Sequence, residues 1–210
     1  MLDAGVLLAF IPLAIAVIVS PGPDSIYTLT RSVSDGRSAG VMAALGSSAG
    51  SIVHTTGAVL GLSAVLQTSA VAFTVVKFVG AAYLVYLGIQ TFRKPDEFEI
   101  SPESTSYTPT ESFQSALLIN VLNPKVAVFF LAFLPQFVQP GSSVTLQIFT
   151  FGVLFASLGF VYQAVLAVFS ARARHVISER DLVQTLLRTA SGSVLIGFGL
   201  KLALEERTAP

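Results

Sequence analysis

Apolar residues fall in long, nearly uninterrupted runs along this chain, without the strict alternation typical of half-exposed strands. A transmembrane helix needs about 20 mostly apolar residues to cross the hydrocarbon core of a bilayer. Six runs meet that length, and each is predicted to form one span: Val6–Thr30, Ala39–Leu66, Ala70–Phe92, Phe113–Val138, Leu146–Ser170 and Leu186–Leu204. The pattern therefore predicts an all-α integral membrane protein with six transmembrane helices.

One polar segment, residues 93–111, interrupts the apolar runs near the middle of the chain. Its acidic, Ser, Thr and Pro residues favour a solvated, flexible linker rather than a folded domain. It divides a single membrane domain, residues 1–210, into two halves of three predicted spans, 1–92 and 112–204. Because three spans per half bring the second half into the membrane from the opposite side, we expect a 3+3 inverted repeat.

Basic residues gather on one side of the predicted spans. The loops on that side carry Arg31, Arg37, Arg93, Lys94, Arg172, Arg174, Arg180 and Arg188. Loops rich in Lys and Arg face the cytoplasm, so we expect a multi-pass protein of the cytoplasmic membrane with both termini outside. The first apolar run lacks a preceding basic segment and is too long for a signal peptide, so we expect it to remain as a span.

Composition narrows the functional class. Apolar residues make up 53% of the chain and charged residues 11%, well below the roughly one quarter typical of soluble domains. The net charge is zero, which gives no support for nucleic-acid binding. The absence of cysteine excludes disulfides, thiolate metal sites and dithiol redox chemistry. We expect no bound metal, no cofactor and no enzymatic activity; the expected partners are the bilayer and a small-molecule solute.

Two clusters of helix-breaking residues lie inside predicted spans. Pro21-Gly22-Pro23, followed by Asp24, interrupts the first span, and Asn123-Pro124-Lys125, with Asn120 one turn earlier, interrupts the fourth. Both breaks lie about 15–18 Å from the cytoplasmic ends of their spans, near the midplane. In lipid, the freed backbone groups need partners, and transporters built on discontinuous helices use such groups to bind cargo. The breaks therefore indicate a transporter of a small polar solute.

Each charged side chain at these breaks allows a structural and a functional interpretation. Asp24 would lie in the first turn of a new half-helix, where a carboxylate stabilises the positive end of the helix dipole. An acid inside a span is also a candidate for binding cargo or a proton. Lys125 either holds a structural partner, which would be Asp24 or backbone carbonyls, or binds cargo. We predict a substrate site of Gly22, Asp24, Asn120, Asn123 and Lys125, in which Asp24 and Lys125 approach each other across a polar cavity.

A small-residue stripe in the second span leads to His54. Gly46 and Gly50 allow helices to pack closely, and their spacing turns His54 toward the bundle. His54 is either a hydrogen-bonded interface residue or, because histidine titrates near neutral pH, a second proton-coupling candidate beside Asp24. The same stretch, Gly46-Ser47-Ser48-Ala49-Gly50, matches the nucleophile elbow of serine hydrolases. That motif works at a strand-to-helix turn, so an intramembrane serine hydrolase is a remote alternative.

Taken in order along the chain, these features resemble the lysine exporter and homoserine/threonine efflux (LysE/RhtB) family. The resemblance covers nearly the whole chain, and only the ordered set is specific. The elements that carry it are Pro21-Gly22-Pro23, Gly36–Gly40 leading into Gly46 and Gly50, Gly80-Ala81-Ala82-Tyr83-Leu84 with Tyr86 and Gly88, Asn120 with Asn123-Pro124-Lys125, Phe129-Phe130, Leu134-Pro135-Gln136-Phe137 and Gly197-Phe198-Gly199-Leu200-Lys201-Leu202.

The resemblance implies a small inner-membrane exporter of amino acids or their derivatives, driven by the proton gradient, and leaves a homodimer open. We expect alternating access at a midplane site. Backbone amides near Gly22 and the ammonium of Lys125 would bind the cargo carboxylate, while Asp24 and carbonyls near Asn123 would bind its ammonium. The alternative is a divalent metal-ion exporter, although one acid and one histidine in the spans form a poor ligand set.

Overall fold

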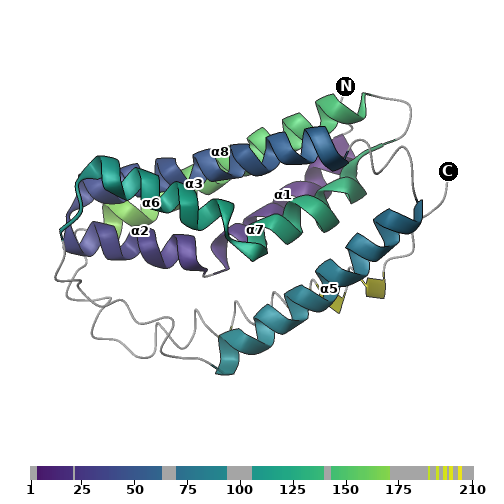
Figure 1. Cartoon of the computed structure of the whole chain (residues 1–210), viewed down its shortest axis with the longest axis horizontal. Coiled ribbons are helices and arrows are strands. Elements are labelled where there is room, and N and C mark those ends of the chain that lie inside the picture. Colours follow the sequence, from purple (N-terminus) through teal and green to yellow (C-terminus); the bar gives the residue numbers. More distant parts are fainter. Residues whose placement is uncertain are drawn as a thin grey trace.

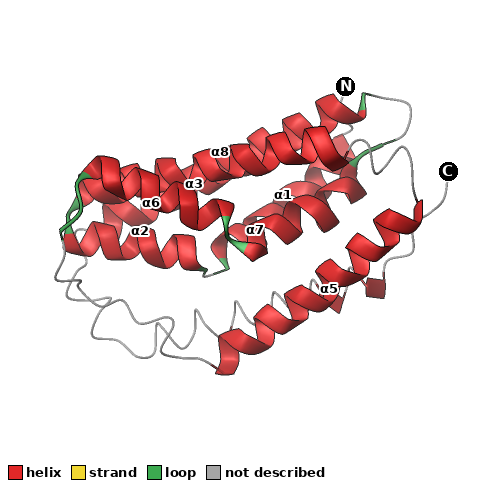
Figure 2. Cartoon of the chain, in the orientation of Figure 1, coloured by secondary structure: helices red, strands yellow, loops and turns green. Residues whose placement is uncertain are grey.

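The computed structural model describes residues 4–20, 22–62, 70–93, 106–139 and 143–170, together with positions 189, 193, 196, 197, 199, 200, 203 and 204. All regular elements in this described part are helices, as the apolar pattern predicted (Figure 2). The predicted linker residues 94–105 and most of the predicted sixth span lie outside it, so the count of six spans, the two halves and the inverted repeat stay predictions.

The first predicted span is two helices rather than one. Helix α1 covers Ala4–Val19, and α2 covers Pro23–Ser34 after a bend of 56°. Pro23 takes the first position of α2, where its missing N–H costs no helical hydrogen bond. Pro21, the other predicted breaker, lies outside the described residues. The discontinuity is thus found, but α2 continues four residues beyond the predicted end because its last turn is polar rather than apolar.

The fourth predicted span is also broken. Helix α6 covers Pro109–Val121, α7 covers Pro124–Val128, and the two pieces are bent by 48°. Beyond α7 the helix first widens into a π-helical segment at Phe129–Phe133 (η3) and then tightens into a 3₁₀ turn at Leu134–Phe137 (η4). Pro124, like Pro23, takes the first position of the second piece and is exposed.

Helix α6 begins inside the segment predicted as linker, which corrects the boundary at residue 111. A capping box explains the early start. The Thr108 hydroxyl accepts from the backbone N–H of Glu111, at 3.3 Å, and the Glu111 carboxylate accepts from the backbone N–H of Thr108, at 2.8 Å. Both of these backbone N–H groups are therefore satisfied before the apolar run begins at Phe113.

The remaining helices follow the predicted segments closely. Helix α3 covers Arg37–Gly57 and passes into a π-helical segment at Ala58–Leu62 (η1), α5 covers Ala70–Arg93, and α8 covers Val144–Ser170. By length and composition, α8 is long and apolar enough to cross a membrane within the described part of the chain. Each of the two bent pairs also qualifies if it is counted as one span.

Helices α2, α3, α6 and α8 run side by side, with α3 packed against the other three (Figure 1). Helix α5 lies along the other side of the molecule and contacts α7 and η3. Close approach of α3 and α6 depends on glycine, because a Cβ at Gly46 would overlap the backbone of Phe113, and one at Gly50 would lie 2.7 Å from the Asn120 side chain. The predicted small-residue stripe is therefore the α3–α6 interface.

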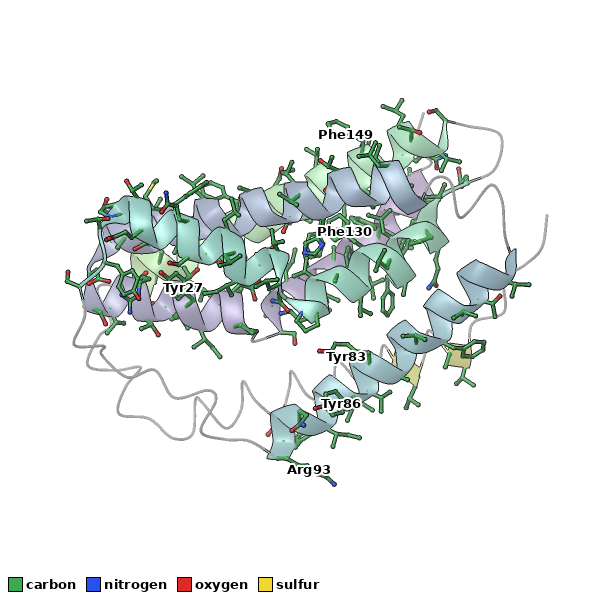
Figure 3. The ribbon with its side chains drawn as sticks, in the orientation of Figure 1. Tyr27, Tyr83, Tyr86, Arg93, Phe130 and Phe149 are labelled. Atoms are coloured by element: carbon green, nitrogen blue, oxygen red, sulfur yellow. The ribbon has the colours of Figure 1, made fainter. Side chains whose placement is uncertain are left out.

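Aromatic side chains of α1, η3 and α8 pack together in a buried core. Phe10 of α1 lies 4.6 Å from Phe151, and Phe129 stacks on Phe155 at 4.3 Å between ring centroids. In Figure 3, Phe130 lies in the interior, whereas Phe149 points outward from α8. The outward faces of the helices carry many exposed large apolar side chains, as expected for contact with lipid.

At the end of α2, a cluster of side chains holds the segment that precedes α6. The Arg31 guanidinium pairs with Asp35 at 2.9 Å and lies 4.2 Å from the Tyr107 ring centroid. The backbone N–H of Tyr107 donates to the other carboxylate oxygen of Asp35, at 3.2 Å. The segment just before α6 is thereby held against the end of α2, on the side that the basic residues predict to be cytoplasmic.

Candidate functional site

The two helix breaks meet, and Asp24 lies at the meeting point. Its carboxylate, 7% exposed, accepts hydrogen bonds from the amide of Asn123 at 2.8 Å and from the amide of Asn120 at 3.3 Å. Asp24 belongs to the first turn of α2, Asn120 to the last turn of α6, and Asn123 caps α7. Both breaks therefore contribute directly to the surroundings of one buried acid.

Lys125 is bound to the opposite break rather than to the acid. Its ammonium donates to the backbone carbonyl of Ser20 at 2.7 Å, just beyond the end of α1. This carbonyl is one of those that a helix end leaves without an intrahelical partner. Asp24 and Lys125 form no direct ion pair, although both are buried. Asp24 and Lys125 therefore lie at one site, as predicted, but each side chain has its own hydrogen-bond partners.

Gly22 occupies the gap between these two charges. A Cβ built there would lie 2.8 Å from the Lys125 Nζ and 3.2 Å from the Asp24 Oδ1. Real Cβ atoms do not approach other atoms within 3.0 Å, so any larger residue would displace the lysine ammonium. Glycine at this position therefore allows both charged groups to lie close to the α1–α2 break.

All of the predicted substrate residues except Gly22 and Asn123 also line one cavity of about 20 Å³, and those two contact its lining. That volume accommodates about one water molecule. The lining consists of Asp24, Lys125, Asn120, Ser47, Ser48, Ser51 and Gln163, with Val17, Ile18, Val126, Phe155 and Gly159.

Ser47 and Gln163 are site residues that the sequence reasoning missed. The Ser47 hydroxyl accepts from the Asn120 amide at 3.1 Å and from the Gln163 amide at 2.8 Å. Gln163 also accepts from the Thr28 hydroxyl at 2.6 Å. A continuous chain of hydrogen bonds thus runs from Asp24 through α6 and α3 to α8. The signal for Gln163 was present, because a lone amide inside an apolar span must face protein or a cavity.

His54 lies behind Asn120 and outside the cavity lining. Its Nε2 is 3.1 Å from the Asn120 carbonyl oxygen, and its ring stacks on Phe130 with 5.7 Å between centroids. Because a carbonyl can only accept, Nε2 carries the proton in this contact. The structure therefore brings His54 into contact with a site residue, one step away from Asp24.

The geometry does not fit the elbow of a serine hydrolase. The residues Gly46–Gly50 lie in the middle of continuous helix α3, not at a strand-to-helix turn. The Ser48 hydroxyl donates to the Ala156 carbonyl at 2.9 Å, and His54 is turned to Asn120. Among the described residues, no group of three or more His, Cys, Asp or Glu side chains is placed to hold a metal ion.

Comparison with known proteins gives the family. The family described as LysE type translocator matches residues 15–206. An uncharacterized membrane protein of Bacillus subtilis, YrhP, is 29% identical over 207 residues, which cover 94% of this chain and 98% of that one. One from Pseudomonas aeruginosa is 31% identical, with 89% of each chain covered.

A homoserine/homoserine lactone efflux protein of Salmonella typhimurium is 33% identical over 135 residues, which cover 64% of this chain and 66% of the relative. No solved structure matches. The family match spans both helix breaks and every residue of the candidate site. The chain is a membrane protein and belongs to the LysE type translocator family.

Proposed function

We propose that this chain exports amino acids or amino-acid derivatives across the cytoplasmic membrane. The family supports transport, and the similarity to the homoserine/homoserine lactone efflux protein of Salmonella supports cargo of the amino-acid class. The single observation that carries the proposal is the arrangement of charge at the two breaks. Asp24 is held by neutral amides and Lys125 by a backbone carbonyl, so the two buried charges lie close together without forming a salt bridge.

An amino acid matches this arrangement, because it carries one ammonium and one carboxylate. The ammonium would bind Asp24, whose two oxygens already face the donors of Asn120 and Asn123. The carboxylate would draw Lys125 away from the Ser20 carbonyl, because an ionised acceptor adds charge attraction that a neutral carbonyl lacks. The Ser20 hydroxyl, buried without a hydrogen-bond partner among the described residues, is a further donor at this end.

The small size of the cavity and the bends in the helix pairs support transport by alternating access. A cavity of about 20 Å³ is far too small for an amino acid, so cargo can reach Asp24 only if the helices around it move apart. The bent pairs α1–α2 and α6–α7 meet at the site, and each break provides a place where one half-helix can tilt. Opening on alternate sides of the breaks would expose Asp24 to one compartment at a time.

Proton coupling is assigned to Asp24, with His54 as the second candidate. A carboxylate that releases cargo ammonium on the outer side can take up a proton in its place, which keeps the buried charge constant. His54 contacts Asn120, which in turn contacts Asp24, so its protonation would act on the site through that asparagine.

Uptake of radiolabelled amino acids by everted membrane vesicles tests the proposal. Vesicles that contain the full chain and have an acidic interior should accumulate at least one amino acid to a higher level than vesicles that contain the Asp24→Asn variant. A protonophore should abolish the difference. If no amino acid or derivative in a broad panel accumulates while the protein is present in the membrane, the proposed function is wrong.

A further inference from the structure

We propose that the end of α1 and Asp24 form a site for one alkali cation, and that the ammonium of Lys125 fills this site as an ion attached to the protein. Export therefore needs no sodium or potassium ion. The cation site itself goes beyond the proposed function, whereas the independence of export from these ions rests on it. The site lies at the first break, which Lys125 reaches from α7.

Backbone carbonyls at the end of α1 favour a positive charge there. The last carbonyls of a helix lack intrahelical partners and form the negative end of its dipole. At this end the Val19 carbonyl accepts from the Tyr162 hydroxyl of α8 at 3.3 Å, and the Ser20 carbonyl accepts from the Lys125 ammonium at 2.7 Å. In transporters with discontinuous helices, such half-helix ends coordinate the coupling cation. Here the cation that binds the Ser20 carbonyl belongs to the protein itself.

Two further kinds of oxygen accompany the Ser20 carbonyl. The hydroxyl of the same residue is buried, with the residue 3% exposed, and it has no hydrogen-bond partner among the described residues. The Asp24 carboxylate lies across Gly22 from the ammonium and supplies a negative charge. Carbonyl, hydroxyl and carboxylate oxygens are the ligand types that hard cations bind. The surroundings of the ammonium therefore suit a sodium or potassium ion as well.

The space beside Gly22 is the size of this one cationic group. A Cβ at Gly22 would lie 2.8 Å from the Lys125 Nζ and 3.2 Å from its Cε, so the end of the lysine side chain fills the space that a glycine leaves. While the ammonium is there, a dissolved cation is excluded, because two like charges would share one buried site. Cargo would draw the ammonium away only during binding, so the site is filled in the protein without cargo.

Thermal unfolding of Lys125 variants in different salts tests the cation site. Lys125→Ala removes the ammonium and leaves its space open, so sodium or potassium chloride should raise the unfolding midpoint of the full chain in detergent. We expect a rise of at least about 2 °C over choline chloride at the same ionic strength. Lys125→Met is the matched control, because it removes the same charge but fills the space with an apolar chain. Its midpoint, like that of the unaltered protein, should not depend on the cation, and adding Asp24→Asn to Lys125→Ala should remove the shift.

The proposal is overturned if neither sodium nor potassium stabilises Lys125→Ala or restores its fold where choline chloride leaves it unfolded. An equal shift in Lys125→Met or in the unaltered protein would place the ion elsewhere and also overturn it. In everted vesicles with the unaltered protein, replacing sodium and potassium by choline should leave the initial rate of amino-acid uptake unchanged. A requirement for either ion would contradict the role of Lys125 and leave amino-acid export intact. If no amino acid is taken up at all, the proposed function is wrong, and the unfolding measurements still decide the cation site.

Discussion

Substitution of Asn123 separates two tasks that one buried side chain performs at the second break. Its Oδ1 accepts from the backbone N–H of Lys125 at 3.0 Å, which caps α7, and its Nδ2 donates to Asp24 at 2.8 Å. The side chain is 2% exposed, so water cannot replace either bond without rearrangement. Different substitutions of Asn123 should remove one or both of these hydrogen bonds.

The magnitudes follow from the two bonds. Losing an N-cap costs about 1 kcal/mol, and losing a hydrogen bond to a charged group costs about 1.5–3 kcal/mol. Asn123→Ser keeps a capping oxygen and should lose only the second amount. Asn123→Ala should lose about 3 kcal/mol in free energy of unfolding. Asn123→Asp keeps the cap but sets a second carboxylate against Asp24, so it should be the least stable variant at neutral pH.

Thermal unfolding of the full-length protein in detergent, followed by circular dichroism, measures this order. Gln114→Ala, an exposed position on α6, is the control and should leave the midpoint unchanged. The reasoning would be refuted if Asn123→Asp were as stable as the unaltered protein, because the asparagine would then not be a donor to an ionised Asp24. Equal loss in the serine and alanine variants would remove the capping role.

Three further predictions follow from the glycines and the basic loops. Gly22→Ala should displace the Lys125 ammonium from the place where it would meet the cargo carboxylate and slow export at least about tenfold, since a hydrogen bond to a charged group contributes about 1.5–3 kcal/mol, while the protein still reaches the membrane; normal export would show that the close approach at Gly22 is not needed for binding. Gly46→Ala should lower the unfolding midpoint because its Cβ meets the backbone of α6, whereas Gly57→Ala, which meets nothing within 4 Å, should not. In a chain without cysteine, Ser38→Cys should resist an impermeant thiol reagent in intact cells and react after permeabilisation; labelling from outside would invert the predicted topology.

Sequence reasoning located the site because helix breaks in a membrane are physically restrictive. Proline and glycine inside an apolar run free backbone groups that must find partners, and the equal depth of the two breaks predicted that Asp24, Asn120 and Lys125 would come together. The structure brings them to one cavity. Their roles in binding remain a proposal.

Other features depend on packing that spacing alone does not reveal. Lys125 could have paired with Asp24 or with a carbonyl, and only the fold shows that it reaches Ser20. Gln163 becomes a site residue because α8 packs against α2 and α3, a tertiary contact between distant parts of the chain. The π-helical segment Phe129–Phe133 contains no proline or glycine that would predict it, and the Phe129 and Phe130 rings pack against Phe155 of α8.

Equilibrium binding of the best-transported radiolabelled amino acid to purified full-length protein tests most directly whether Asp24 holds the cargo ammonium. Glu111→Gln is the matched carboxyl-to-amide control, because glutamine preserves the capping box at the exposed start of α6. We expect this control to bind like the unaltered protein. We expect Asp24→Asn, shown to be folded by circular dichroism, to bind at least about tenfold more weakly, because a charged hydrogen-bond partner is lost. Unchanged binding by Asp24→Asn would contradict the account, and the acid between the two breaks would then be a structural cap.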